Sequence, residues 1–358
     1  MRKAEPVALT SRPTVSVVIP CYNYGHFLPN AVESVATQEG VDVDVLIVDD
    51  ASTDDSFHVA EELASRFSRV RVVRNEENLG LIGTANKGLA TVTGTYALLI
   101  SADDALAPGA LARAAALMEA NPDVGLTYGP VNYTTEAELP QEVPDPASHW
   151  VIWDGVEWAS RLYRNAENQI YSPEAVVRTS TMREVGDYDP ALPYTSDVEM
   201  WLRFAARAKV GFIAGTVQAY YRVHGSNMSM TQGGMTGERR QLRELRHRMD
   251  AFESASKCFA HGKRYLAVAR RGAAKYALLL ARIERDASPE SDEYIDELVT
   301  FAATLDPTAR LRAAWAASGT RRRLARILTR TGARSLVVLP RVLATGRRRV
   351  RNEDTGVH

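Results

Sequence analysis

Residues 96–104, YALLISADD, place a short apolar run directly before two adjacent carboxylates, Asp103 and Asp104. The run is typical of a buried strand, and a buried strand has no packing use for a pair of desolvated carboxylates. A strand end that opens into a cleft and holds a hard divalent cation would compensate both charges. The alternative is an acidic turn or helix cap, because residues 105–109 form a plausible helix start.

Short apolar runs like this one recur throughout the first hundred residues. Apolar runs alternate with segments of helical periodicity, at 15–20, 26–37, 43–48, 52–67, 70–73 and 81–91, with Ser52 or Thr53 as the cap of one helix. Continuous apolar strands separated by helices predict an α/β fold with a mostly parallel sheet covered on both faces. Ligands of such sheets bind beyond the carboxyl ends of the strands. We therefore expect the polar groups at three strand ends to form one site: Tyr22-Asn23, Asp49-Asp50 and Asp103-Asp104.

The remaining sequence is less regular. Residues 134–150 resemble a surface loop, and later elements are predicted at 154–166, 175–180, 195–205 and 217–223. Ser196 and Glu199 have the spacing of a capping box at the start of the third of these. Beyond Gly233-Gly234 the pattern is helical. These features predict an α/β domain at 12–232, a basic, amphipathic helical region at 235–350 and a disordered tail at 351–358.

Composition narrows the class of protein. The fractions of hydrophobic residues, 45%, and charged residues, 24%, are typical of a soluble globular protein. Cys21 and Cys258 cannot form a disulfide framework or zinc knuckle. The polar start excludes a signal peptide, and no apolar run approaches the ~18–20 residues that span a bilayer. We therefore expect a cytoplasmic protein.

The formal net charge of -1 hides a strong asymmetry, since residues 311–351 hold many arginines and no Asp or Glu. Apolar residues interleave with these arginines, which is the pattern of a basic amphipathic helix. Peripheral contact with the anionic inner face of a membrane is one interpretation, and a solvated helix with a disordered tail is the other. We expect no nucleic-acid partner.

Known nucleotide-binding fingerprints are absent after the first strand, where PCYNYG stands at 20–25. Six segments instead resemble, in order, the motifs of family 2 glycosyltransferases over residues 14–230: VSVVIPCYNYGHFLPNAVESVATQ, DVLIVDDASTDDS, NEENLGLIGTANKGLA, LLISADDALAPGAL, YTSDVEMWLRFA and YYRVHGSNMS. The resemblance implies the GT-A fold, a Rossmann-like mostly parallel sheet flanked by helices, followed here by a helical region that it does not cover. It also implies an inverting hexosyltransferase that uses a nucleotide-diphosphate sugar, with UDP-sugars as the first choice.

The expected acceptor is a hydroxyl of a glycan or lipid-linked molecule in cell-surface polysaccharide or glycoconjugate biosynthesis. The resemblance assigns donor-nucleotide binding to Pro20, Tyr22, Asn23, Asp49, Asp50, Asn78, Lys87 and Asp104. In this assignment Tyr22 packs against the base or ribose, and Asp49 and Asp50 bind the base and the ribose. Lys87 stabilises the diphosphate. An ordinary turn aromatic, a helix cap and a solvated lysine are the respective alternatives.

Asp103 and Asp104 match the D-x-D region of the family, although Ser101 stands where a first Asp is common. The resemblance implies that Asp103 ligates a divalent metal, that Asp104 assists through metal, water or sugar, and that His224 completes the shell or touches the diphosphate. A structural histidine is the alternative for His224. Mg²⁺ or Mn²⁺ suits oxygen donors and diphosphates, and would neutralise the departing nucleoside diphosphate.

Asp197 matches the acidic residue that acts as general base on the acceptor side. Glu199 is its rival, but two residues along a helix point to different faces, so both cannot reach one hydroxyl. Glu199 and Trp201 are candidates for the acceptor side, with a capping partner and a core tryptophan as alternatives. A non-catalytic nucleotide-sugar-binding module would need no base. A sugar nucleotidyltransferase would carry a basic Gly-rich loop, and PCYNYG has no Lys or Arg.

Overall fold

The computed structural model describes residues 1–135, 145–225, 227, 239–287, 292–309 and 355. The chain divides into two compact units. The first comprises residues 1–160, 168–231 and 353–357, and the second comprises 161–167, 232–352 and 358.

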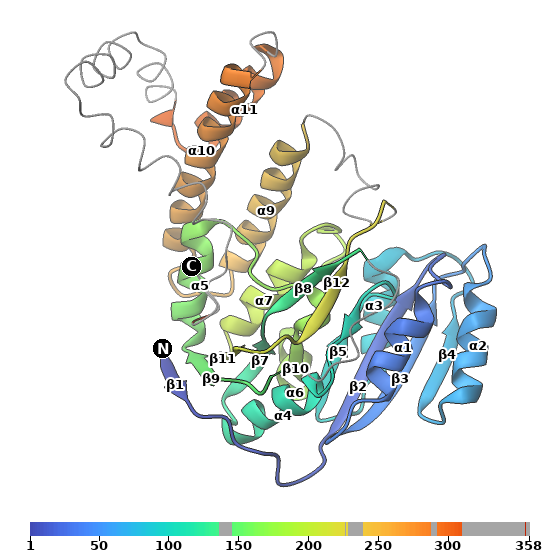
Figure 1. The fold of residues 1–358 in the computed structure, drawn as a ribbon. Helices are drawn as coiled ribbons and strands as arrows, with labels where there is room; N and C mark the ends of the chain where they lie inside the picture. The colour runs from blue at the N-terminus through green and yellow to red at the C-terminus, as the bar shows by residue number, and fades with distance from the viewer. Residues whose placement is uncertain (136–144, 226, 228–238, 288–291, 310–354, 356–358) are drawn as a thin grey trace, which may run out of the picture. The chain divides into compact units, whose positions relative to one another are not determined.

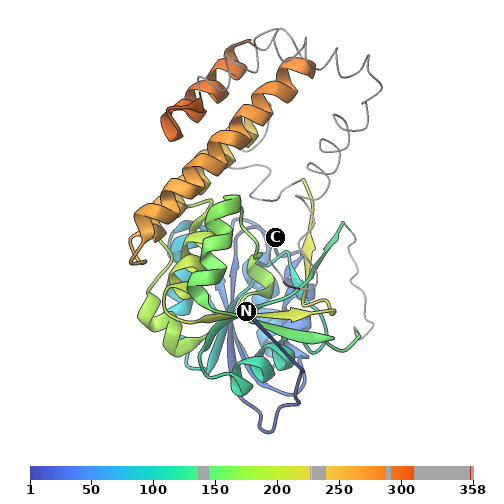
Figure 2. The ribbon, with the colours of Figure 1, turned by 90° about the vertical axis from the view of Figure 1, so that its left-hand side faces the viewer.

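The first unit is built on a large twisted sheet whose described strands run in the order β1-β9-β11-β7-β10-β5-β2-β3-β4 (Figures 1 and 2). The strands are β1 Arg2–Ala4, β2 Thr14–Cys21, β3 Asp42–Asp49, β4 Val70–Arg74, β5 Tyr96–Leu99, β7 Val124–Tyr128, β9 His149–Trp153, β10 Val176–Arg178 and β11 Lys209–Ala214. As predicted, β5, β2, β3 and β4 pair in parallel. Strand β10 is antiparallel to both of its neighbours, β5 and β7.

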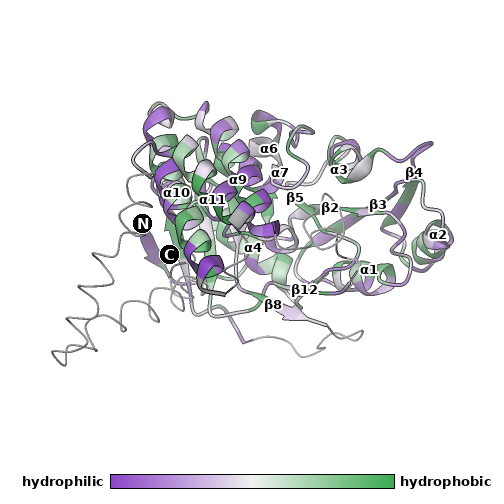
Figure 3. Cartoon of the chain, turned by 90° about the horizontal axis from the view of Figure 1, so that it is seen from above, coloured by the Kyte–Doolittle hydropathy of each residue, from purple (hydrophilic) through white to green (hydrophobic). Residues whose placement is uncertain are grey.

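Helices cover both faces of this sheet. Helix α1, Leu28–Ala36, and helix α3, Gly80–Leu89, lie on opposite faces of the parallel strands (Figure 3). Val17 and Val18 alternate between the two faces of β2 and are 1% and 0% exposed, so neither face meets water. The other helices that begin in this unit are α2 Ser56–Arg66, α4 Ala110–Ala120, α5 Gly155–Asn165, α6 Thr179–Val185 and α7 Ser196–Ala205.

A small second sheet follows the carboxyl end of β5. Its strands, in the order β6-β12-β8, are β6 Ala105–Leu106, β12 Ala219–Arg222 and β8 Val131–Thr134. Strand β12 is antiparallel to β6 and parallel to β8. The helix start considered at 105–109 is therefore wrong, because those residues enter β6 and α4 begins only after Gly109, whose φ is +73°.

Two predicted helix caps are also wrong. Helix α2 begins at Ser56 rather than near Ser52 or Thr53, and Ser52 instead accepts a hydrogen bond from the backbone of Asn23. In α7 the N-cap is Thr195, without a side-chain capping bond, so Ser196 and Glu199 form no capping box. Ser52 and Thr53 contact Asn23 instead, and Glu199 pairs with Arg203 on the same helix. The predicted loop at 134–150 overlaps β8 and β9, and residues 136–144 lie outside the described part.

The described part of the second unit is helical. Its helices are α9 Arg240–Ser256, α10 Gly262–Ala287 and α11 Asp292–Leu305, with α10 and α11 side by side (Figure 2). Tyr163 stacks on Tyr265 at 5.6 Å and donates a 3.1 Å hydrogen bond to the carbonyl of Phe252. The basic stretch at 311–351 and nearly all of the tail fall outside the described residues. No helix that the structure describes is both long enough and apolar enough to cross a bilayer.

Candidate active site

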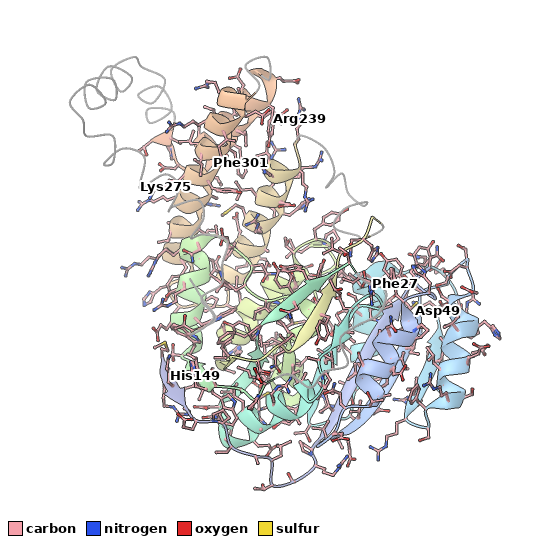
Figure 4. All side chains as sticks on the ribbon, in the orientation of Figure 1. Phe27, Asp49, His149, Arg239, Lys275 and Phe301 are labelled. Carbon is pink, nitrogen blue, oxygen red and sulfur yellow. The ribbon has the colours of Figure 1, made fainter. Side chains whose placement is uncertain are left out.

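The carboxyl ends of β2, β3 and β5 meet at one edge of the large sheet. Cys21 at the end of β2 is the register partner of Asp49 at the end of β3. Figure 4 places Asp49 and Phe27, which follows β2, at this same edge. The predicted strand-end groups therefore share one edge, because parallel strands end in the same direction.

Asp103 faces two side chains from the segment that follows β12. Its Oδ2 lies 3.1 Å from Nε2 of His224 and accepts a 3.3 Å hydrogen bond from Nδ2 of Asn227. The imidazole is flanked by the rings of Phe27 and Tyr24, with centroids 4.5 and 5.6 Å away. Residues more than one hundred positions apart are thus assembled around one carboxylate.

Arg222 binds the carboxylate of Asp104 and the backbone carbonyl of Asp103. Its backbone N–H donates to Oδ1 of Asp104 at 3.0 Å, and its Nε donates to the Asp103 carbonyl at 3.0 Å. The guanidinium also lies 5.2 Å from the ring centre of Phe27. Because Asp104 accepts a backbone bond, its place in the fold depends on β12.

Both carboxylates are buried, at 7% exposure for Asp103 and 3% for Asp104. Burial raises the pKa of Asp103, against the opposing influence of His224 and Arg222. Burial, and after it the charge of Asp103, raises the pKa of Asp104 well above its usual range. A cation would relieve this cost, since an opposite charge favours the ionised form.

The donor set fits a divalent ion held jointly by protein and substrate. Asp103 Oδ2 and His224 Nε2 are close enough to ligate one ion. Mg²⁺ in phosphate sites is commonly held by one or two carboxylates together with phosphate oxygens and water. Over the described ranges no group of three His, Cys, Asp or Glu residues could hold a metal unaided.

Asp49 is fully buried, and its side chain contacts Ser52 and Arg74. Its Oδ2 accepts the Ser52 N–H at 3.2 Å and lies 3.3 Å from Nε of Arg74. Its Oδ1 is buried and has no hydrogen-bond partner among the described residues. A buried carboxylate oxygen of this kind retains the capacity to accept a further bond.

Asp50 is the centre of a polar network that joins three predicted residues. Its Oδ1 accepts from Nδ2 of Asn75 at 2.7 Å and from the Leu79 N–H at 2.8 Å. Lys87 Nζ donates to Oδ1 of Asn75 at 2.7 Å, and Asn78 Nδ2 donates to the Asp50 carbonyl at 3.2 Å. Asn75 was not predicted as a site residue, although it directly follows β4 and is therefore a polar residue at a strand end like the others.

The turn after β2 is tied to the turn after β3. Asn23 has a left-handed φ of +57°, and its Oδ1 accepts the Thr53 N–H at 2.8 Å. Pro20 is buried in β2, whereas Tyr22 is 42% exposed. Of these predicted nucleotide-binding residues, Tyr22 therefore offers the ring that solvent reaches.

Asp197 occupies a separate environment at the start of α7. Its Oδ2 accepts a 2.6 Å hydrogen bond from Nδ2 of Asn168, and its Oδ1 accepts the Val198 N–H at 2.7 Å. Burial raises its pKa to about 6, in spite of these two bonds. Asn168 was not predicted, because an Asn in an irregular segment carries no local signal of its partner.

Glu199 and Trp201, predicted for the acceptor side, lie inside the protein. Glu199 is 3% exposed and pairs with Nε of Arg203 at 2.9 Å, while Arg203 also donates to the carbonyls of Val185 and Asp187. Trp201 is 2% exposed and meets the edge of Tyr188 at 6.3 Å. The core alternative accounts for Trp201, and an ion pair accounts for Glu199.

Known proteins share this domain. The sequence profile described as Glycosyl transferase family 2 matches residues 16–183. The Mycobacterium tuberculosis protein MT1568 is 28% identical over 57% of this chain, which spans 65% of that relative. The O-antigen biosynthesis protein RfbC of Myxococcus xanthus is 29% identical over 63% of this chain, but the match spans only 17% of RfbC.

Two solved structures are similar at low identity. TarS 1–349 of S. aureus in complex with UDP-GlcNAc aligns with a TM-score of 0.59 at 15% identity, over 83% of this chain and 82% of that one. The mannosyltransferase PcManGT of Pyrobaculum calidifontis, in complex with GDP-Man and Mn²⁺, aligns with a TM-score of 0.54 at 18% identity, over 88% and 90%. At these identities the likeness concerns the fold.

The first unit has the GT-A fold, a mostly parallel sheet flanked by helices, as these similar structures do. The match to the glycosyltransferase family 2 profile covers residues 16–183, and several of the similar proteins are named glycosyltransferases.

Proposed function

We propose that this chain is an inverting, metal-dependent glycosyltransferase that moves a sugar from a nucleotide-diphosphate sugar to a hydroxyl of a glycan or lipid-linked acceptor. The observation that carries the proposal is the approach of Asp103 and His224 to 3.1 Å, at the sheet edge that also holds the Asp50 network. The UDP-GlcNAc and GDP-Man complexes of similar folds support a nucleotide-sugar donor. The name of RfbC supports a surface polysaccharide as the product.

In this proposal Asp103 and His224 hold Mg²⁺ or Mn²⁺, which supplies positive charge for the departing nucleoside diphosphate. Asp104 keeps β12 in place through the Arg222 N–H, so its first role is to position the segment that carries His224. The Mn²⁺ in PcManGT supports this choice of ion.

The donor nucleotide is proposed to lie across the ends of β2, β3 and β4. The exposed ring of Tyr22 suits packing against a base, because aromatic faces bind planar rings. The buried, unsatisfied Oδ1 of Asp49 suits an imide or hydroxyl donor. Lys87, held by Asn75, places an ammonium group at this edge for the diphosphate.

Asp197 is proposed as the general base. It takes the proton of the acceptor hydroxyl while that oxygen forms a bond to the anomeric carbon from the face opposite the leaving group. The anomeric C–O bond breaks, and its electron pair leaves with the nucleoside diphosphate. A base with a pKa of about 6 is largely ionised at neutral pH and still accepts a proton in the transition state.

The test is a donor screen on the full chain. UDP-, GDP- and dTDP-sugars are each added with Mn²⁺ or with EDTA, and the thermal midpoint and the release of nucleoside diphosphate are measured. We expect one nucleotide class to raise the midpoint in Mn²⁺ and not in EDTA, because a ligand that binds only the native state stabilises it. No stabilisation by any nucleotide-sugar would overturn the proposal. Donor binding without transfer to a broad acceptor panel would favour a binding module.

A further inference from the structure

Three tyrosines from distant segments meet beside the small sheet. Tyr133 lies on β8, Tyr221 on β12, and Tyr171 directly before the short 3₁₀ helix at Ser172–Glu174. Their ring centroids are 5.7 Å apart for Tyr133 and Tyr171, 5.7 Å for Tyr133 and Tyr221, and 5.4 Å for Tyr171 and Tyr221. We name these residues the tyrosine cluster.

The tyrosine cluster is open to solvent. Tyr133 is 58% exposed, more than any other large apolar side chain in the described ranges, and Tyr171 is 39% exposed. Tyr221 is half-buried beneath them. Adjacent exposed aromatics contribute little to a core, and contiguous apolar surface of this kind marks binding sites.

The fold holds the tyrosine cluster in a fixed arrangement. Tyr133 and Tyr221 are register partners in the parallel pairing of β8 with β12. The Tyr171 N–H donates to Oε1 of Glu174 at 3.2 Å, and Glu174 is 3% exposed. A preformed aromatic surface binds a ligand with less loss of conformational freedom than a mobile one.

Both chemical centres of the proposed reaction are connected to the tyrosine cluster by short stretches of chain. Tyr221 immediately precedes Arg222, whose backbone binds Asp104 at 3.0 Å. Tyr171 follows Asn168 by three residues, and Asn168 binds Asp197 at 2.6 Å. A molecule on these rings would therefore lie near the elements that carry both the metal ligands and the base.

We propose that the tyrosine cluster binds a pyranose ring of the acceptor, and thereby deepens the proposed function on which it rests. A pyranose has an apolar C–H face that packs on an aromatic ring, and equatorial hydroxyls that pair with phenol oxygens. Tyrosine offers both kinds of surface. A purely aliphatic chain would contact the rings and form no hydrogen bond with the phenol oxygens, whereas a sugar can do both, so we assign the cluster to carbohydrate.

The test compares variants Tyr133→Ala and Tyr171→Ala, alone and together, with Tyr133→Phe and with Val73→Ala. Val73 is a 41% exposed apolar residue on β4 and serves as the control. Binding of the UDP-saturated protein to an array of lipid-free oligosaccharides is measured first. For each oligosaccharide that accepts sugar, the KM for acceptor and the KM for donor are then determined.

We expect each alanine to raise the acceptor KM about three- to tenfold, since an aromatic contact contributes roughly 0.5–1.5 kcal/mol. The donor KM should stay within twofold, and Val73→Ala should resemble the wild type. Tyr133→Phe should raise the acceptor KM less than Tyr133→Ala does, because it keeps the ring and loses only the phenol oxygen. An unchanged acceptor KM in the double alanine variant overturns the inference, and so does a wild type that binds no oligosaccharide while it still binds UDP. A wild type that binds no nucleotide-sugar would instead overturn the proposed function, so the two failures are distinguishable.

Discussion

The two acidic centres of the first unit, around Asp103 and around Asp197, are both desolvated but have different partners. Asp103 lies beside a second buried carboxylate and within 3.1 Å of an imidazole. Asp197 is bound by a neutral amide, Asn168, at 2.6 Å. Two adjacent buried negative charges favour a cation, whereas a single carboxylate with a raised pKa suits proton transfer.

A second contrast lies within α7. Asp197 and Glu199 are two residues apart, yet only Glu199 pairs with an arginine, Arg203. The pairing commits Glu199 to the structure and leaves Asp197 as the group suited to act as base. The surroundings of these two acidic residues therefore differ, although they are close in sequence.

Among the variants considered, Asp103→Ala should reduce transfer the most. We expect transfer to fall by at least about 10³-fold, because a metal ion contributes several kcal/mol to the stabilisation of a leaving diphosphate. The Mn²⁺-dependent thermal shift with donor should disappear as well. Retained turnover in Mn²⁺ would show that the metal site lies elsewhere.

Asp197→Asn should reduce transfer without reducing donor binding, and should therefore distinguish the role of Asp197 from that of Asp103. We expect kcat for transfer to fall by roughly 10²–10³-fold, since the amide cannot accept the proton. The donor-induced thermal shift in Mn²⁺ should persist, in contrast to Asp103→Ala. If both signals vanish in a variant that retains its circular dichroism spectrum, Asp197 belongs to the donor site.

The pH profile sharpens the assignment of the base. Burial raises the pKa of Asp197 to about 6, and only its ionised form accepts a proton. Acceptor-dependent kcat/KM should therefore fall about tenfold per pH unit below about 6 and reach a plateau above it. The residual activity of Asp197→Asn should lack this acid limb, and a wild-type profile flat down to pH 4.5 would contradict the role.

Glu199→Gln tests the structural member of the pair. Loss of the buried ion pair with Arg203 should lower the free energy of unfolding by about 2 kcal/mol. The loss stays at this size because the guanidinium of Arg203 keeps its two carbonyl acceptors. Urea unfolding measures this loss, and the turnover of the folded fraction should stay within a few-fold of the wild type. A 10²-fold loss of turnover without loss of stability would reverse the roles of Glu199 and Asp197.

Asp44→Asn gives the baseline for removal of a carboxylate. Asp44 pairs with Arg71 at 3.1 Å, and the two side chains are 42% and 57% exposed. We expect a change below about 0.5 kcal/mol in urea unfolding, because solvent screens such pairs, and unchanged turnover. A larger effect would mean that charge removal by itself perturbs this domain.

The parallel half of the large sheet could be predicted because β2, β3 and β5 are mostly buried on both faces and are followed by polar residues. The pairing in the other half could not be predicted. A strand was expected at 175–180, where β10 lies, but the antiparallel pairing of β10 and β9 with distant strands leaves no local pattern. The helix start at 105–109 failed for the same reason, since β6 forms only when β12 lies beside it.

The sequence alone determined that carboxylates follow β3 and β5 and that parallel pairing brings them to one edge. Only the tertiary structure decided which partner each carboxylate has. It placed His224 against Asp103, Asn168 against Asp197 and Arg203 against Glu199. The physical reason is that the pattern of apolar residues that predicts a strand extends over only a few neighbouring residues. The burial and the pairing of a carboxylate depend instead on residues from distant parts of the chain.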